Sequence, residues 1–187
     1  MTQATKTPRS PAAQTQTMAL DETAIDAARH SLDQGAVTPS HSPWRDDIVK
    51  LLNDALATEI VCVLRYRRHH YTADGLASPK IVEEFMVHAV EEQAHADLLA
   101  KRIVQLGGEP DFSPDSLTAR SHAEYDDSSD LMAMIRSNLV AERVAIESYR
   151  QMIVLIGDKD STTRRVLEHI LGEEEEHADE LKDWLAM

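Results

Sequence analysis

The sequence predicts an all-α protein, a four-helix bundle in which the connection between the second and third long helices is long. Hydrophobic residues make up 42% of the 187 residues but aromatic residues only 4%, so the apolar content is mainly aliphatic. Four long stretches have the apolar periodicity of amphipathic helices, and residues typical of helix ends bound each stretch. The connections between them are short, long and short, as in bundles with one crossover.

The chain before the bundle, residues 1–42, is expected to be a disordered tail that contains a candidate short helix near 21–34. Residues 1–19 have almost no large apolar side chains, so burial cannot offset the entropy lost on ordering. Asp21 is the expected N-cap of the short helix, and Gly35 is its expected stop. The bundle is expected to occupy residues 43–187.

The long helices are located by their start and stop residues. The expected starts combine an N-cap with a proline or a short polar residue: Ser42 and Pro43, Ser78 and Pro79, Asp130, and Asp160 or Ser161. The expected stops are turn residues: Asp74 with Gly75, the Gly107 and Gly108 pair, and Gly157. A polar connection of about 20 residues separates the second long helix from the third.

One glutamate interrupts the apolar stripe of each long helix. The stripes follow alternating steps of four and three residues, and the four inward glutamates are Glu59, Glu92, Glu142 and Glu174. Two of the stripes also carry a histidine three residues later, namely His95 and His177, so each histidine shares a helix face with its glutamate.

The four inward glutamates are also expected at one depth. The predicted helix midpoints fall near residues 58, 92, 143 and 173, each within about 3 Å of rise from its glutamate. The separation is 33 residues between Glu59 and Glu92 and 32 between Glu142 and Glu174. The two helical hairpins therefore resemble copies related by a pseudo-two-fold axis.

Four carboxylates in a dry core are too costly to bury without positive charge, because each unpaired ion costs several kcal/mol. Two divalent cations would offset the four negative charges. One Glu from each of two helices and Glu-x-x-His from each of the other two is the ligand pattern of dinuclear ferritin-like proteins. Carboxylates with one imidazole per metal suit iron or manganese, and zinc also fits. A bundle with buried Glu–His pairs and no metal remains the alternative.

At these residues the sequence resembles the bacterioferritins and the wider ferritin-like superfamily, including Dps-like proteins. The motifs are "LATEIVCVLRY", "EEQAHAD", "LVAER" and "EEEEHADEL", with "LGGEP" at the end of the second helix. The resemblance implies a ferroxidase centre in which two iron ions per subunit are held by the glutamates and histidines above, the single carboxylates bridging or chelating. It also implies that Tyr66, seven residues after Glu59, lies beside the centre as an electron donor or an ordinary core aromatic residue.

The resemblance further implies iron storage or detoxification by oxidation of Fe(II) with O₂ or H₂O₂ inside a hollow oligomer. Gln93 replaces the methionine that ligates haem in bacterioferritins, which argues against haem. Only ten residues follow His177, too few for the fifth helix of 24-subunit cages, so a dodecamer of the Dps type is expected. Two other readings stay open: a non-storage di-metal oxidase or peroxidase, rubrerythrin-like or manganese-catalase-like, and a DNA-protecting shell protein.

Composition narrows the partners and the compartment. With 33 acidic and 19 basic residues the net charge is −14, which disfavours nucleic acid and favours cations. A single cysteine, Cys62, cannot form an internal disulfide, and the sequence has no apolar run long enough to span a membrane. We therefore expect a soluble, cytoplasmic protein. Among the remaining polar residues, His88 and Asn138 are expected to be hydrogen-bonded core groups or supports for metal ligands, and His69 and His70 to lie at a solvated helix end.

Overall fold

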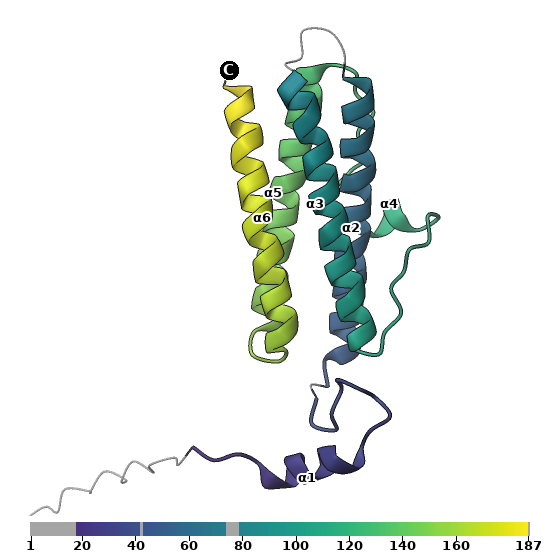
Figure 1. Ribbon diagram of the computed structural model, residues 1–187, viewed down its shortest axis with the longest axis vertical. Helices are drawn as coiled ribbons and strands as arrows, with labels where there is room; N and C mark the ends of the chain where they lie inside the picture. The colour runs from purple at the N-terminus through teal and green to yellow at the C-terminus, as the bar shows by residue number, and fades with distance from the viewer. Residues whose placement is uncertain (1–17, 42, 74–78, 187) are drawn as a thin grey trace, which may run out of the picture.

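The computed structural model describes residues 18–41, 43–73 and 79–186. Within them lie six helices and no strand: α1 (Glu22–His30), α2 (Arg45–Thr72), α3 (Pro79–Gln105), α4 (Leu117–Arg120), α5 (Leu131–Ile156) and α6 (Ser161–Leu185). The four long helices align as a bundle, while α1 stands apart from it (Figure 1). The predicted all-α bundle is confirmed. None of the helices in the described residues is long and apolar enough to cross a membrane.

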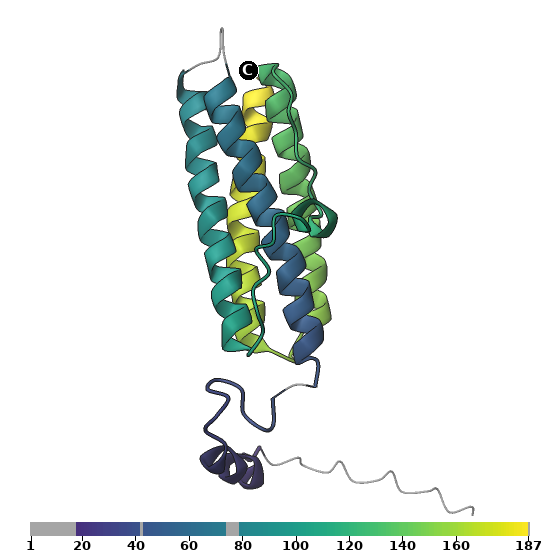
Figure 2. The same cartoon turned by 90° about the vertical axis from the view of Figure 1, so that its right-hand side faces the viewer.

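The bundle consists of two antiparallel hairpins, α2 with α3 and α5 with α6. The connection from α3 to α5 runs along the length of the bundle beside α2, so that α5 starts at the end opposite to where α3 stops (Figure 2). Each hairpin also contacts the other, through α2 with α5 and through α3 with α6. This topology places the midpoints of the four long helices side by side.

Most helix ends follow the predicted residues. Asp130 and Asp160 cap α5 and α6 by accepting backbone N–H bonds from the first turn. Gly157 ends α5 with φ +49°, a conformation that side chains with a Cβ rarely adopt. The predicted end residues Ser42, Asp74, Gly75 and Ser78, like residues 1–17 of the predicted tail, lie outside the described residues.

Two predicted boundaries are wrong. The helix α2 begins at Arg45 with Trp44 as its N-cap, two residues after the predicted start at Pro43. Asp46 and Asp47 then occupy its first turn, where acidic side chains stabilise the positive end of the helix dipole. The helix α1 ends at His30 rather than near residue 34. None of its residues is buried, so no tertiary contact supports a longer helix.

The α3–α5 connection is fastened to α2 by side chains of that helix. Asn53 donates from Nδ2 to the Glu109 carbonyl oxygen at 3.1 Å and accepts from the Asp111 N–H at 2.8 Å. Five residues later, the Thr58 hydroxyl accepts from the His122 N–H at 3.0 Å. The connection, predicted as a polar linker, also contains the short helix α4, which packs on α2. It therefore forms an ordered cover over this side of the bundle.

The apolar core is divided into two large clusters. One includes Leu52, Leu99, Met152 and Leu167. The other includes Phe85, Met134 and Leu181. On every long helix the inward glutamate lies between the residues that belong to the two clusters. A polar layer at the middle of the bundle is thus sealed from both ends by close-packed hydrocarbon.

Candidate metal centre

The structure brings the six predicted charged residues together at mid-bundle. Each of the four glutamate residues is no more than 1% exposed, and the two histidines are 1% and 5% exposed. Each lies on the inward face because the glutamate takes a stripe position and the histidine follows one helical turn later. The predicted convergence of Glu59, Glu92, Glu142 and Glu174 with His95 and His177 is therefore present.

These side chains form two overlapping groups. In each group one potential ligand atom per residue lies within 4.8 Å of all the others. The first group is Glu59, Glu92, His95 and Glu174. The second is Glu92, Glu142, Glu174 and His177. Because Glu92 and Glu174 belong to both groups, they are placed to bridge two cations, and Glu59 and Glu142 are placed to contact one each.

The imidazoles meet the carboxylates through their Nδ1 atoms. His95 Nδ1 lies 3.1 Å from Glu174 Oε1 and 3.5 Å from Glu59 Oε2. His177 Nδ1 lies 3.7 Å from Glu92 Oε1 and 3.9 Å from Glu142 Oε2. Several such separations are longer than hydrogen bonds, so a cation of about 2.1 Å bond length would fit with small side-chain rotations.

The opposite nitrogen of each imidazole pairs with a carboxylate nearer the surface. His95 Nε2 lies 2.8 Å from Glu173 Oε2, and His177 Nε2 lies 3.0 Å from Glu91 Oε2. A carboxylate on one ring nitrogen fixes the tautomer and turns the other nitrogen toward the metal position. The pairing of Glu91 and Glu173 with these histidines was not predicted from the sequence. The available signal was that each directly precedes an inward glutamate on the helix across the layer from its histidine.

Two tyrosines donate hydrogen bonds to Glu59 and Glu142, the two carboxylates that are not shared between the groups. The Tyr66 hydroxyl donates to Glu142 Oε1, and the Tyr149 hydroxyl donates to Glu59 Oε1. Burial, followed by the adjacent negative carboxylates, raises the pKa of both phenols well above the ordinary value. Of these two tyrosines, only Tyr66 was predicted to lie beside the centre. Tyr149 follows Glu142 by seven residues, just as Tyr66 follows Glu59. Tyr149 is therefore the pseudo-symmetric counterpart of Tyr66.

Without a cation, the pKa shifts in the layer favour retained protons on some of its groups. Burial, followed by the negative charge of Glu142, raises the pKa of Glu92 well above its usual range. Burial, followed by the charge of Glu92, does the same to the pKa of Glu174. Burial alone would lower the pKa of His95, but the surrounding carboxylates, Glu174 first, raise it. Burial would raise the pKa of Glu59, yet hydrogen bonds from its neighbours lower it.

The donor atoms of this layer fit a pair of divalent cations. Eight of its buried side-chain atoms have no hydrogen-bond partner: Glu59 Oε2, both oxygens of Glu92, Glu142 Oε2, both oxygens of Glu174, and Nδ1 of His95 and His177. Buried polar atoms are normally satisfied, so this many orphans in one place indicates a missing positive partner. Oxygen donors with one imidazole per position suit iron or manganese, and also accommodate zinc.

Other polar side chains form a buried network beside the layer. The Asn138 side chain accepts from Arg65 Nε at 2.7 Å and lies 3.1 Å from His69 Nδ1. Asn138 is therefore the hydrogen-bonded core residue that was predicted. The prediction that His69 lies at a solvated helix end is wrong, because its side chain is fully buried and also pairs with Asp126 at 3.1 Å. A polar connection folded over α2 supplies this partner.

Fold and site together define a helical bundle built around a buried carboxylate–histidine layer that suits two metal ions. The chain belongs to the ferritin-like domain family, whose model matches residues 49–187. A bacterioferritin from Desulfovibrio desulfuricans is 28% identical over 131 residues, which cover 70% of this chain and 69% of that protein. A bacterioferritin from Mycobacterium leprae is 27% identical over 142 residues, 75% of this chain and 85% of that protein.

A solved structure is similar over more of the chain. The dodecameric thioferritin of Bacteroides fragilis, a bacterioferritin-related protein, superimposes with a TM-score of 0.73 and 29% identity. The match covers 89% of this chain and 94% of the other. The Dps protein of Mycobacterium smegmatis, at 21% identity and a TM-score of 0.74, shares the fold.

Proposed function

We propose that this protein stores or detoxifies iron by oxidising Fe(II) with O₂ or H₂O₂ in the mid-bundle layer, two iron ions per chain. The observation that carries the proposal is the convergence of four buried glutamates and two histidines with eight unpartnered donor atoms. Bacterioferritin relatives support it independently. Haem has no part in the proposal, since position 93 holds a glutamine where the resemblance places the methionine that ligates haem in bacterioferritins.

The residues of the layer have distinct tasks in this proposal. Glu92 and Glu174 span both iron positions and set their separation, while Glu59 and Glu142 each complete one position. Nδ1 of His95 and His177 supplies one nitrogen donor per position. Each Fe(II) held there would give one electron, so a pair supplies the two electrons that, with two protons, reduce O₂ to H₂O₂ or H₂O₂ to two water molecules. The Fe(III) product either stays in the layer or moves to a store in the interior of an oligomer.

Tyr66 is proposed as an additional electron donor, and Tyr149 provides the comparison. Both phenols are buried and hydrogen-bonded to a carboxylate of the layer. A phenol that loses an electron must also lose its proton, and the carboxylate at each hydroxyl is an acceptor for it. The two tyrosines therefore offer an internal control, because they occupy pseudo-symmetric positions.

The oligomer is proposed to be a hollow homo-dodecamer. The support is the similarity to the dodecameric protein of Bacteroides fragilis. Gel filtration separates storage from the alternative of a non-storage di-metal oxidase or peroxidase, because storage requires a shell. Elution as a monomer or dimer would remove the storage part of the proposal and leave the oxidase part.

A DNA-protecting role is the weaker alternative. The net charge of −14 opposes binding to phosphates, and the similarity to Dps proteins extends to the fold alone. We propose that nucleic acid is not a partner. Retardation of plasmid DNA in a gel at low salt, lost as the salt concentration rises, would contradict this and favour the DNA-protecting role.

The decisive experiment compares two glutamates of the same helix. Glu174→Gln removes a shared donor, whereas Glu176→Gln removes the same charge from an exposed position two residues away. We expect Glu174→Gln to abolish rapid Fe(II) oxidation, followed by the absorbance of Fe(III), with the helical circular dichroism unchanged. Glu92→Gln is expected to behave in the same way, and Glu176→Gln to oxidise iron like the wild type. Unchanged oxidation in Glu174→Gln and Glu92→Gln would refute the assignment.

A further inference from the structure

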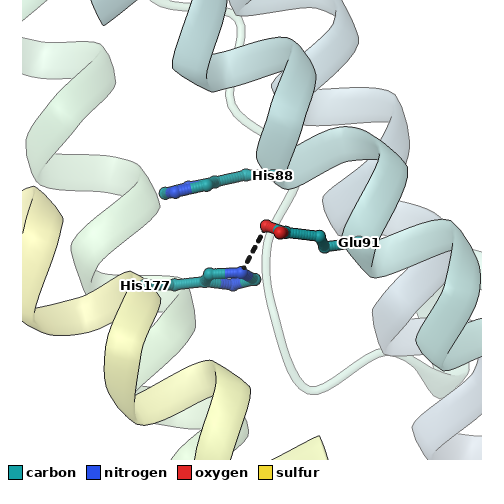
Figure 3. A group of neighbouring side chains, drawn as sticks. All are labelled: His88, Glu91 and His177. Atoms are coloured by element: carbon teal, nitrogen blue, oxygen red, sulfur yellow. Dashed lines mark hydrogen bonds and ion pairs between the residues drawn. The ribbon is translucent and has the colours of Figure 1, made fainter.

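A third group of potential ligands lies on the solvent side of the buried layer. It consists of His88, Glu91 and His177, with one ligand atom of each within 4.8 Å of the other two. The two imidazoles come from α3 and α6 and stack with their centroids 4.3 Å apart, and the Glu91 carboxylate reaches the edge of the His177 ring (Figure 3). The Glu91 side chain is 46% exposed, whereas those of the histidines are 1% and 6% exposed. The group therefore joins the surface to the interior.

The pseudo-symmetry of the bundle shows that this group is an addition to the layer. An offset of 82 residues relates Glu92 to Glu174 and His95 to His177. The same offset relates His88 to Ile170, which is buried in the apolar core at the matching position. An aliphatic side chain thus satisfies the packing requirement there, and the histidine at position 88 is not needed to fill space.

His88 is also incompletely satisfied. Its Nε2 lies 3.0 Å from Glu180 Oε2, but its buried Nδ1 has no hydrogen-bond partner. Glu180, like His88, has an apolar pseudo-symmetric counterpart, Leu98. An unpaired imidazole nitrogen in a buried position is unfavourable unless it gains a partner. Two imidazoles and a carboxylate are a donor set that divalent zinc or iron accepts.

We propose that His88, Glu91 and His177 form an outer site for a divalent cation, one step outside the buried layer. His177 is the common member, with Nε2 toward the outer site and Nδ1 toward Glu92 and Glu142. A neutral imidazole offers a lone pair on only one nitrogen at a time. The two sites therefore use His177 in turn, and a cation held outside lies one ligand away from the inner position.

The outer site is consequently a transit position through which cations enter the layer. This transit role rests on the proposed dinuclear centre, while binding at the outer site does not. The side of the layer at His95 has Glu173 in place of Glu91, and its second histidine, His169, lies 3.7 Å from Glu173 but is 59% exposed. Among the described residues His169 does not join Glu173 and His95 in a group of potential ligands, so entry is expected on the His177 side.

Binding at the outer site is tested with Zn²⁺ in a chain whose layer is disabled by Glu92→Gln and Glu174→Gln. We expect one Zn²⁺ per chain, with an anomalous peak at the zinc edge between His88, Glu91 and His177. Adding His88→Gln should weaken this binding about tenfold or more, because a ligand is lost. Absence of a zinc ion from the group in the disabled chain, with the folded structure intact in the same crystals, would overturn the proposal.

The transit role is tested by the rate at which Co²⁺ fills the layer, followed by its visible absorption. Glu91→Gln and Glu173→Gln each remove the carboxylate that pairs with one layer histidine, so they form a matched pair. We expect Glu91→Gln to slow filling about tenfold more than Glu173→Gln, and His88→Gln to slow it without changing the final two ions per chain. Equal slowing by the matched pair, with no effect of His88→Gln, would overturn the transit role.

The two proposals fail in different ways. A wild-type chain that binds no ion pair in the layer would refute the proposed function, whatever the disabled chain does. A wild-type chain that fills the layer with two ions while the disabled chain binds none would refute the outer site and leave the proposed function standing.

Discussion

Filling the mid-bundle layer with divalent cations should release protons. Without metal, the raised pKa values of Glu92 and Glu174 leave a proton on each carboxyl, and the raised pKa of His95 leaves its ring doubly protonated. A metal needs the carboxylates ionised and the imidazole neutral. Two bound cations therefore displace the protons that these groups hold, at most one from each of the two carboxyl groups and one from the imidazolium.

Zinc is the suitable titrant because, unlike iron, it is not oxidised. Calorimetric titrations in buffers of different ionisation enthalpy give the number of protons released per zinc pair. The Glu92→Gln variant lacks this carboxyl proton, so we expect it to release about one proton fewer than the wild type for any zinc pair that it still binds. Glu84→Gln, on the same helix but outside the layer, should release the wild-type number.

The sign of the pH dependence follows from the same pKa shifts. Because the pKa values of Glu92 and Glu174 are higher in the folded state, their protonated forms stabilise the metal-free protein fully below about pH 4.3. This stability is lost as the pH rises through the raised pKa values. Metal affinity changes in the opposite direction, with the logarithm of the two-ion constant rising by one per pH unit for each proton that the cations displace. Release of less than one proton per zinc pair, or equal release by wild type and Glu92→Gln, would refute this reasoning.

Three further substitutions test the fold and the site. Gly108→Ala should destabilise the protein by about 1–3 kcal/mol in urea unfolding, because a Cβ there would lie 2.6 Å from a valine γ-carbon of α2; an unchanged midpoint would contradict this close contact. Asp160→Ala removes the N-cap of α6 and leaves the buried Arg102 guanidinium without its carboxylate partner, so unfolding should become easier by about 3–5 kcal/mol, and a loss below 1 kcal/mol would show that the pair is dispensable. Tyr66→Phe should remove a tyrosyl radical signal that appears on Fe(II) oxidation, whereas Tyr149→Phe should retain it; a signal that persists in Tyr66→Phe would exclude this residue as the electron donor.

The sequence by itself determined the bundle and the depth of its polar layer. Helical periodicity fixes which face of a helix a side chain occupies, and distance from the helix end fixes its depth. Glu59, Glu92, Glu142 and Glu174 satisfied both conditions, since each interrupts an apolar stripe near the midpoint of its helix. The capping residues Asp130 and Asp160 were also predictable from the sequence, because a cap contacts only the first turn of its own helix.

Only the tertiary structure decided which side chains meet across the layer. The pairing of His177 with Glu91, the sharing of Glu92 and Glu174 between two groups, and the stacking of His88 on His177 all join residues of different helices. Such contacts depend on how far each helix is rotated about its axis and on which rotamer each side chain adopts. The burial of His69 likewise required a distant segment to fold over α2. Periodicity within one helix carries no information about either, because it describes a helix relative to itself and not to its neighbours.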